Sequence, residues 1–368
     1  MLPRFHVPAA DQVLVSETAL RRTVTEVFVA CGVPADDAAD GADVLVSADL
    51  RGVETHGVSN MLRAYVALFA SGELNPTPKV TVIRDGPAMA NLDFDRGLGI
   101  LYGKKAMQLA IDKARVTGVG VVAVRNSGHL GAVGHFAMQA AKQGLIGVCM
   151  TAMSKLVLPT FGAEARIGTN PISIAAPANE QPFFLYDAAT STIAGNKIGL
   201  ARRVGADVEP GWIAEPDGTP IMHAQPVPPG QMYGLGGHHL LPLGGTREQG
   251  SHKGYGLGLM VEMLTTMLSG GVPSALTDQN PLGRHHFAAY DIAAFCDPDE
   301  FSETMDQFLA ALAATPPAPG HERVVYPGLI EYETQRHRRA HGIPLHREVI
   351  EWMKNCTDGF GLDCLETL

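Results

Sequence analysis

The hydrophobic pattern of the first 70 residues predicts three amphipathic helices. In residues 16–32, Ser16 is a suitable N-cap and apolar side chains recur every three or four positions. The second helix covers about 34–49, with acidic residues in its first turn, where the helix dipole favours negative charge. The third covers about 58–70. The segment NPTPK at 75–79 then ends the helical pattern and indicates a boundary.

The central part of the chain alternates between short apolar runs and helical patterns. Residues 79–95 are typical of two strands around a turn at Asp85-Gly86. A helix at about 98–116 leads to the apolar strand GVGVVAV, and the loop Asn126-Ser127-Gly128-His129-Leu130-Gly131 leads to a helix at about 132–143. Further strands are expected at LIGVCMT (145–151), PISIAAP (171–177) and FFLYDAA (183–189).

From Lys253 onward the pattern is mostly helical, with a linker-like break at PPAPG, 316–320. Helices from both chain ends therefore bracket a central region that mixes helices and strands. We expect an α/β (α+β) fold with two domains. Residues 1–76 with 251–368 would form a discontinuous helical domain, and residues 77–250 the central α/β domain.

Composition excludes several classes of protein. The 368 residues are 46% hydrophobic and 18% charged, with a net charge of −10, which argues against binding nucleic acid or an anionic membrane. No apolar run reaches the length of a membrane span, and the first residues lack a signal peptide's apolar core. The five scattered cysteines form no CxxC pair, which favours reduced thiols and a cytoplasmic location.

Glycine-rich and histidine-rich stretches give only weak signals for phosphate or metal binding. The segment 118–123 matches GxGxxA, but it is a β-run rather than a turn that opens a helix, and no acidic residue follows at the dinucleotide-binding spacing. His238-His239 and His285-His286 are adjacent pairs, whose side chains point apart on a helix or a strand. We therefore expect no metal site.

Two other segments are better candidates for chemistry. The loop NSGHLG turns into a helix, where free backbone amides could bind a phosphate; the alternative is an ordinary glycine-rich turn. In RGVETHGV, His56 could be a proton donor near neutral pH, oriented by Thr55; the alternative is a surface or capping histidine. The residues alone leave both pairs of alternatives open.

Eight segments taken in order resemble the motifs of one enzyme family. They are RGVETHGV, RNSGHLGAVGHFA, MTAMSKLVLPTFG, ARIGTNPISIAAP, YDAATSTIAGNK, LLPLGG, SHKGYGLGLMVE and YPGLIE, and the resemblance runs from about Ser16 to Pro344. The chain in this respect resembles the malate/L-lactate dehydrogenase family, which lacks a Rossmann fold. The family includes ureidoglycolate, sulfolactate and 2,3-diketogulonate oxidoreductases and cyclic-imine reductases.

The resemblance implies a homodimeric oxidoreductase that transfers hydride between NAD or NADP and a small 2-hydroxy or 2-oxo acid. The cofactor would lie on the central domain, which would hold a mostly antiparallel sheet. By motif position, His56 is the expected proton donor or acceptor and Thr55 the residue that orients it. His129 matches a position assigned as the catalytic base in some members and as a cofactor contact in others, and Thr169 a position near the substrate. The other expected cofactor-binding positions are Leu130, Gly131, Ser154, Asp187, Ala188, Ala189, Lys253 and Gly328.

Three departures from the family pattern concern the substrate. Asn60 stands where the family usually has an arginine that binds the substrate carboxylate. Arg63, seven residues after His56, could supply a replacement; alternatively, Arg63 is an ordinary solvated charge on the helix, or the substrate is larger or less acidic. Lys197 replaces an aspartate of some imine-reducing members, which favours a hydroxy acid. Residues 222–250 form a longer polar segment than usual, either a lid or a dimer contact.

The oxidoreductase interpretation has competitors from other classes. A reductase of a cyclic imine or an uncharged ketone would explain the missing arginine. A metal-assisted hydrolase would have to use the histidine pairs, and a non-catalytic binding protein would be expected to have lost His56 as well. The sequence does not distinguish NAD from NADP, because the acidic ribose marker belongs to Rossmann proteins.

Overall fold

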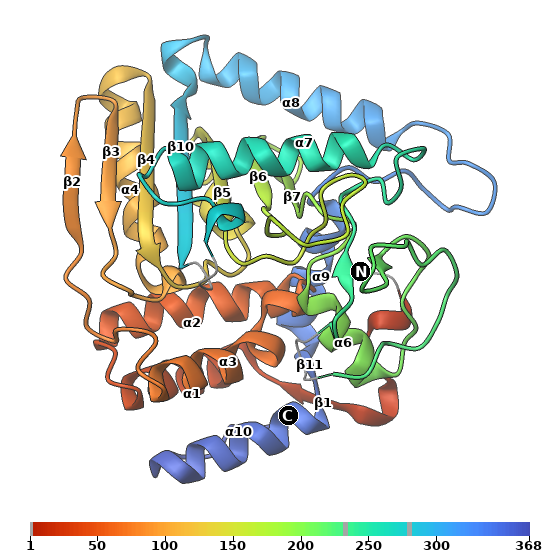
Figure 1. The fold of residues 1–368 in the computed structure, drawn as a ribbon. Coiled ribbons are helices and arrows are strands. Elements are labelled where there is room, and N and C mark those ends of the chain that lie inside the picture. Colours follow the sequence, from red (N-terminus) through yellow and green to blue (C-terminus); the bar gives the residue numbers. More distant parts are fainter. Residues whose placement is uncertain (1–2, 231–234, 278–281) are drawn as a thin grey trace.

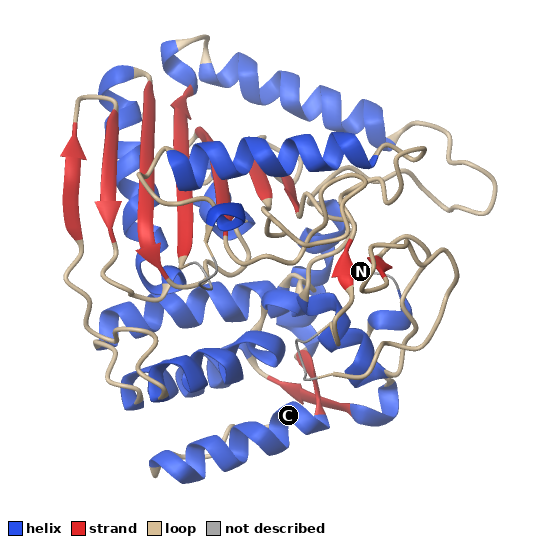
Figure 2. Ribbon diagram, in the orientation of Figure 1, coloured by secondary structure: helices blue, strands red, loops and turns tan. Residues whose placement is uncertain are grey.

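A seven-stranded sheet forms the centre of the molecule (Figures 1 and 2). The computed structural model describes residues 3–230, 235–277 and 282–368. Within them, the strands lie in the order β2-β3-β4-β10-β5-β6-β7, and only the β3–β4 pair is parallel. The strands are β2 (Thr81–Asp85), β3 (Met89–Asp93), β4 (Val119–Ser127), β5 (Leu145–Ala152), β6 (Ile172–Ala176), β7 (Phe184–Ala188) and β10 (Gly283–Asp291). The expected mostly antiparallel sheet is confirmed.

Helices cover both faces of this sheet. On one face lie α4 (Gly99–Thr117) and α5 (Gly134–Ala141), and a Cβ added at Gly120 of β4 would stand 1.9 Å from the Ala110 carbonyl oxygen of α4. On the other face lie α7 (Ser251–Glu262) and the π-helical segment η4 (Met263–Met267), which lines a cavity together with Val121 of β4. Figure 1 shows α7 crossing in front of the strands.

The two ends of the chain meet below the sheet. The helices α1 (Glu17–Ala30), α2 (Ala35–Leu50) and α3 (Val58–Ala70) lie near α9 (Leu329–His341) and α10 (Arg347–Phe360) (Figure 1). Strand β1 (Gln12–Val15) pairs with β11 (Ile343–His346) and fastens the N-terminal segment to the C-terminal one. The other elements are η1 (Pro3–Phe5), η2 (Ala9–Asp11), η3 (Glu54–His56), α6 (Asn196–Val204), β8 (Ile213–Ala214), β9 (His239–Leu240), η5 (Ser274–Leu276), η6 (Ile292–Ala294) and α8 (Pro298–Ala313).

The sequence pattern located most of the N-terminal and central elements. The three N-terminal helices, the hairpin around Asp85-Gly86 and the four apolar strands of the central region are confirmed with small shifts of their ends. One shift concerns the NSGHLG loop, because its first two residues continue β4. No helix of the described residues is long and apolar enough to cross a membrane.

The expectation of mostly helical structure after Lys253 does not hold for two elements, β10 and β11. Strand β10 lies in the middle of the sheet between β4 and β5. Both of its faces are covered, so the sequence GRHHFAAYD lacks the alternation of a half-exposed strand. The proposed division into 1–76 with 251–368 and 77–250 remains a prediction, and residues 283–291 belong to the central sheet.

The turn between α2 and α3 depends on a carboxyl group. The backbone N–H of Val58 donates to Oδ2 of Asp49 at 2.7 Å, which caps the start of α3. The intervening Gly57 lies against the same side chain: an added Cβ would stand 2.0 Å from Asp49 Oδ1. Glycine is therefore required here by the close approach of Asp49, and the turn that carries residues 54–56 is fixed by this contact.

Replacing Gly57 tests this constraint. Gly57→Ala should lower the free energy of unfolding by roughly 2–4 kcal/mol, because Asp49 must move and its buried hydrogen bond to Val58 is lost. The matched control is Gly256→Ala on α7, where an added Cβ meets no atom within 4 Å. Thermal and denaturant unfolding would measure both variants. A Gly57→Ala protein as stable as the control would contradict the proposed role of the contact.

Candidate active site

Two cavities meet at His56. The first has a volume of about 280 Å³ and lies between α2, α5, β7 and the start of α9; the second has about 240 Å³ and lies between α3 and the loops after β4 and β5. Their shared wall consists of His56, Gly131, Thr169, Pro171 and Ala194. An imidazole in this wall reaches reactants that occupy either cavity.

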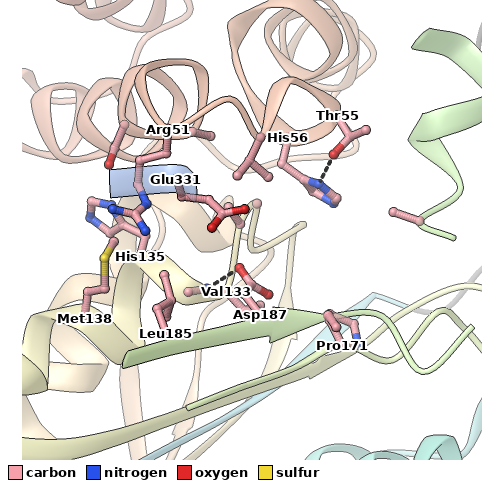
Figure 3. Close-up of a pocket in the computed structure, with 18 of the residues that line it drawn as sticks. Arg51, Thr55, His56, Val133, His135, Met138, Pro171, Leu185, Asp187 and Glu331 are labelled. Atoms are coloured by element: carbon pink, nitrogen blue, oxygen red, sulfur yellow. Dashed lines mark hydrogen bonds between the residues drawn. The ribbon is translucent and has the colours of Figure 1, made fainter. Parts of the chain in front are cut away.

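The ring of His56 is oriented by its neighbour. Thr55 Oγ1 lies 3.0 Å from His56 Nδ1, which leaves Nε2 as the nitrogen available for proton exchange (Figure 3). The backbone carbonyl of Thr55 accepts a hydrogen bond from Asn196 Nδ2 at 3.0 Å. Burial lowers the pKa of His56 to about 4, so the ring is neutral near pH 7 in the free protein.

A second histidine stacks on the first. The rings of His56 and His129 are 5.7 Å apart between centroids and inclined by 10°. His129 Nδ1 lies 2.7 Å from the hydroxyl of Tyr65 and accepts the N–H of Gly131 at 3.1 Å. Burial, followed by the neighbouring His56 and His285, lowers the pKa of His129 to about 3. The two expected catalytic histidines are thus brought together as neutral rings.

A buried ionic group supports the turn that carries His56. Arg338 of α9 donates to Glu54 Oε1 and to the carbonyl of Asp49, each at 2.5 Å. Burial and the neighbouring Glu54 raise the pKa of Asp49 to about 8, so Asp49 is largely protonated at neutral pH. Arg338 and Glu54 form an ion pair. This group ties the catalytic turn to the C-terminal part of the chain.

The first cavity has a polar end with charges of both signs. Figure 3 shows Asp187 of β7 and Glu331 of α9 directed into the space beside Arg51. Asp187 Oδ2 accepts the N–H of Gly134 at 2.7 Å, and Arg51 reaches Gln335 Oε1 at 3.4 Å. Gly328 also lines this cavity, and a Cβ added there would stand 3.0 Å from the backbone nitrogen of Leu185.

The expected cofactor positions divide between the cavities. Gly131, Asp187, Ala188, Ala189 and Gly328 line the first, while His129, Gly131 and Ser154 line the second. Two expected positions line neither cavity: Leu130 is fully buried in the core, and Lys253 is exposed on α7. Their expected contacts with a cofactor stay predictions without support from the cavity geometry.

The phosphate-binding interpretation of the NSGHLG loop loses two donors. The N–H of Gly131 donates to His129, and the N–H of Gly134, at the start of α5, donates to Asp187. These two amides therefore have partners within the protein. The amide of Gly131 in this loop instead orients the ring of His129.

The position of the missing arginine is occupied by a buried asparagine. Asn60 is 0% exposed and lines neither cavity, and its Oδ1 accepts a hydrogen bond from Arg203 Nη1 at 2.6 Å. Arg203 also bonds Glu348 at 3.0 Å. Arg63 pairs with the same Glu348 at 2.5 Å and its guanidinium lies 5.2 Å from the Trp352 ring centroid, so it too lines neither cavity. This placement argues against Arg63 as the replacement clamp.

Neutral groups surround the second cavity. Among the residues that the structure describes, its polar lining is Tyr65, His56, His129, Thr151, Ser154, Thr169, Asn170 and Asn196, and no lysine or arginine lines it. Ser154 and Asn170 have positive φ values of 69° and 40°, a conformation that L residues rarely adopt and that often accompanies functional sites. Thr169, expected near the substrate, lies in the wall that the two cavities share.

Sequence reasoning missed Tyr65 and Asn196. The hydrophobic pattern of α3 made Tyr65 a core residue, and its ring is indeed buried. The available signal was its hydroxyl group, which needs a partner when the ring is buried. Asn196 could not be found, because only the folded chain brings α6 beside the turn that carries Thr55.

The remaining predicted features do not line either cavity. Lys197 places its ammonium 5.3 and 5.4 Å from the ring centroids of Phe5 and Trp212. His285 bonds Thr151 at 2.8 Å, and no cluster of three metal-ligating side chains occurs in the described part of the chain. Of the segment 222–250, residues 231–234 lie outside the described residues, and the carbonyl of Pro228 accepts a hydrogen bond from Arg202 of α6.

Comparison with known proteins agrees with this geometry. The family model described as malate/L-lactate dehydrogenase matches residues 15–354. A malate dehydrogenase of Pyrococcus horikoshii is 41% identical over 347 residues, covering 93% of this chain and 94% of its own. A ureidoglycolate dehydrogenase (NAD(+)) of Escherichia coli is 30% identical over 347 residues, covering 92% and 94%. A solved structure of malate dehydrogenase from Pyrococcus horikoshii OT3 superimposes with a TM-score of 0.87 at 37% identity, covering 98% of this chain and 99% of that one.

These matches extend over nearly the whole chain and confirm the resemblance, the fold and the enzyme class expected from the eight motifs. The chain is an oxidoreductase that acts on CH–OH groups with a nicotinamide cofactor. It belongs to the malate/L-lactate dehydrogenase family.

Proposed function

We propose that this protein transfers hydride between NAD or NADP and a 2-hydroxy acid or its 2-oxo acid, with His56 as proton donor and acceptor. The observation that carries the proposal is the place of His56 in the wall between two cavities, with Nδ1 bonded to Thr55. The printed names of the relatives, malate and ureidoglycolate dehydrogenase, support the substrate class.

The residues present fit a nicotinamide cofactor. Small side chains and glycines, at Gly131, Ala188, Ala189, Ala194 and Gly328, leave room along the wall of the first cavity. The first cavity borders the second at His56, so a nicotinamide bound in one would lie next to a small substrate bound in the other. The carboxylates of Asp187 and Glu331 can accept hydrogen bonds from ribose hydroxyl groups. Neither residue decides between NAD and NADP.

The chemistry follows from the charge that develops on the substrate oxygen. When bound, the nicotinamide supplies or accepts the hydride. In reduction, a protonated His56 stabilises the oxygen as it becomes an alkoxide and then gives it the proton. In oxidation, the neutral ring takes the hydroxyl proton at Nε2. Thr55 accepts the Nδ1–H in both states and keeps the ring oriented.

A second candidate function rests on the lining of the second cavity. It holds no basic side chain among the described residues, and Asn60 is bonded to Arg203 instead of facing the substrate. A reductase of a cyclic imine or an uncharged ketone would need no cation there. Lys197 interacts with aromatic rings and is not among the residues that line either cavity, so it does not favour the imine reaction.

We also propose a homodimer and retain the cytoplasmic location as a prediction from the sequence. The dimer is supported by an apolar surface, here called the methionine face, formed by exposed Met260, Met263, Met267 and Leu268 with Met89 of β3. Met89, Met267 and Leu268 line one cavity, which shows that the strand and the helix contribute to the same surface. An exposed apolar patch of this kind is typical of a protein–protein contact.

A substrate panel tests the proposed reaction. Oxidation of NADH and NADPH would be followed at 340 nm with pyruvate, oxaloacetate, branched 2-oxo acids, their methyl esters and cyclic imines. The wild-type protein should reduce a 2-oxo acid, and His56→Gln should lose roughly 10²- to 10⁴-fold in kcat because the proton donor is gone. His6→Gln, at an exposed position, is the matched control. Turnover of esters or imines alone would establish the second candidate, and failure to bind either cofactor would contradict both.

Sedimentation equilibrium tests the dimer. The wild-type chain should sediment at twice its monomer mass, and Met263→Glu should shift it to the monomer because a buried charge disfavours the contact. Phe308→Glu, an exposed apolar position on α8 outside the methionine face, should remain a dimer. A monomeric wild type, or a Met263→Glu protein that dimerises as tightly as wild type, would refute this use of the surface.

A further inference from the structure

The hydrogen bonds of His129 define which of its nitrogens carries the proton. Nδ1 receives the backbone N–H of Gly131, and a backbone amide can only donate. An imidazole nitrogen that accepts has no hydrogen of its own. The neutral ring must therefore carry its single proton on Nε2.

The hydroxyl group of Tyr65 favours the same position for the proton. Its hydroxyl oxygen lies 2.7 Å from His129 Nδ1. If Nδ1 carried a proton and donated it to Tyr65, the N–H of Gly131 would point at a protonated nitrogen that cannot accept it. The consistent arrangement has Tyr65 donating, with its ring held in the core of α3. Two donors thus stabilise the same tautomer.

The other side of the ring faces the second cavity. His129 lines that cavity, and Nε2 bonds no residue in the described part of the chain. The partly buried ring remains neutral at physiological pH, since burial lowers its pKa. An N–H on Nε2 is therefore available to an acceptor that lies beside His56.

We propose that Tyr65 and the Gly131 amide hold His129 as the Nε2–H tautomer, which makes His129 a hydrogen-bond donor to a substrate oxygen and leaves proton exchange to His56. This inference rests on the proposed function and deepens it. The Nε2 proton of His129 stays on the ring throughout, so only one proton moves, between His56 and the substrate oxygen. Tyr65 is a positioning residue that acts through His129.

The proposal also accounts for substrate binding without the family's arginine. The second cavity offers an oxygen-bearing substrate neutral donors, and the Nε2–H of His129 is one whose direction the protein fixes. A neutral donor binds a carboxylate or a carbonyl oxygen without requiring a charge. The substrate class favoured here is one whose carboxyl or carbonyl oxygen is held by such donors rather than by a guanidinium.

Nitrogen NMR of the free protein tests the tautomer without any turnover. In ¹⁵N-labelled wild type, two-bond ¹H–¹⁵N correlations should show His129 with a protonated Nε2 and an unprotonated Nδ1, its signals being assigned by their absence in His129→Gln. Tyr65→Phe should raise the population of the other tautomer, and Tyr290→Phe, at a partly exposed position on β10, should leave it unchanged. A wild-type His129 protonated at Nδ1 would overturn the proposal.

Kinetics of two replacements separate a donor from a base. If His129 donates a hydrogen bond, His129→Phe should lose roughly 10- to 100-fold in kcat/KM, and His129→Gln, which keeps an N–H donor, should lose clearly less. Equal losses in both variants would contradict the donor role. A protein that shows the Nε2–H tautomer but turns over no 2-oxo acid would instead count against the proposed function, so the two failures are distinguishable.

Discussion

The hydrogen bond from the Val58 amide to the Asp49 carboxyl group sets the position of the catalytic turn. It is one neutral hydrogen bond, worth about 1 kcal/mol net, but the residues packed around Asp49 hold the carboxyl group in this one position. Gly57 allows Asp49 to approach, and Arg338 holds Glu54 and the Asp49 carbonyl from the C-terminal part of the chain. The motif Thr55-His56-Gly57 thus requires its glycine for packing, and the proposed function gives its histidine the proton exchange.

The second histidine, His129, is likewise held in position by contacts with neighbouring segments. His129 follows a sheet strand, and its ring is oriented by a loop amide and by Tyr65 from α3. The active site is therefore built where the N-terminal helices meet the end of the central sheet. Each imidazole has one nitrogen bonded to the protein. Under the proposed function the other nitrogen faces the reactants, with His56 exchanging a proton and His129 staying neutral.

The sequence allowed the fold to be predicted where a segment is covered on one side, as in α1, α3 and the hairpin around Asp85-Gly86. It also succeeded for the buried strands β4 and β5, which contain continuous apolar runs. It failed for β10, which is also buried on both faces but carries Arg284, His285 and His286 near its start and so shows neither alternation nor an unbroken apolar run. The motifs singled out His56, Thr55 and His129, which the fold brings together, but spacing along α3 could not show that Arg63 pairs with Glu348 or that Asn60 is bonded to Arg203. Those contacts involve residues more than a hundred positions away.

The central claim, that His56 exchanges the proton, is tested most directly by the pH dependence of kcat/KM in both directions between pH 6 and 9. With a pKa of about 4, the protonated fraction of His56 shrinks as pH rises, so kcat/KM for reduction should fall about tenfold per pH unit. Oxidation, which needs the neutral ring, should show no such fall, and His56→Gln should lose the slope of the reduction profile. A slope that persists unchanged in His56→Gln would contradict the account.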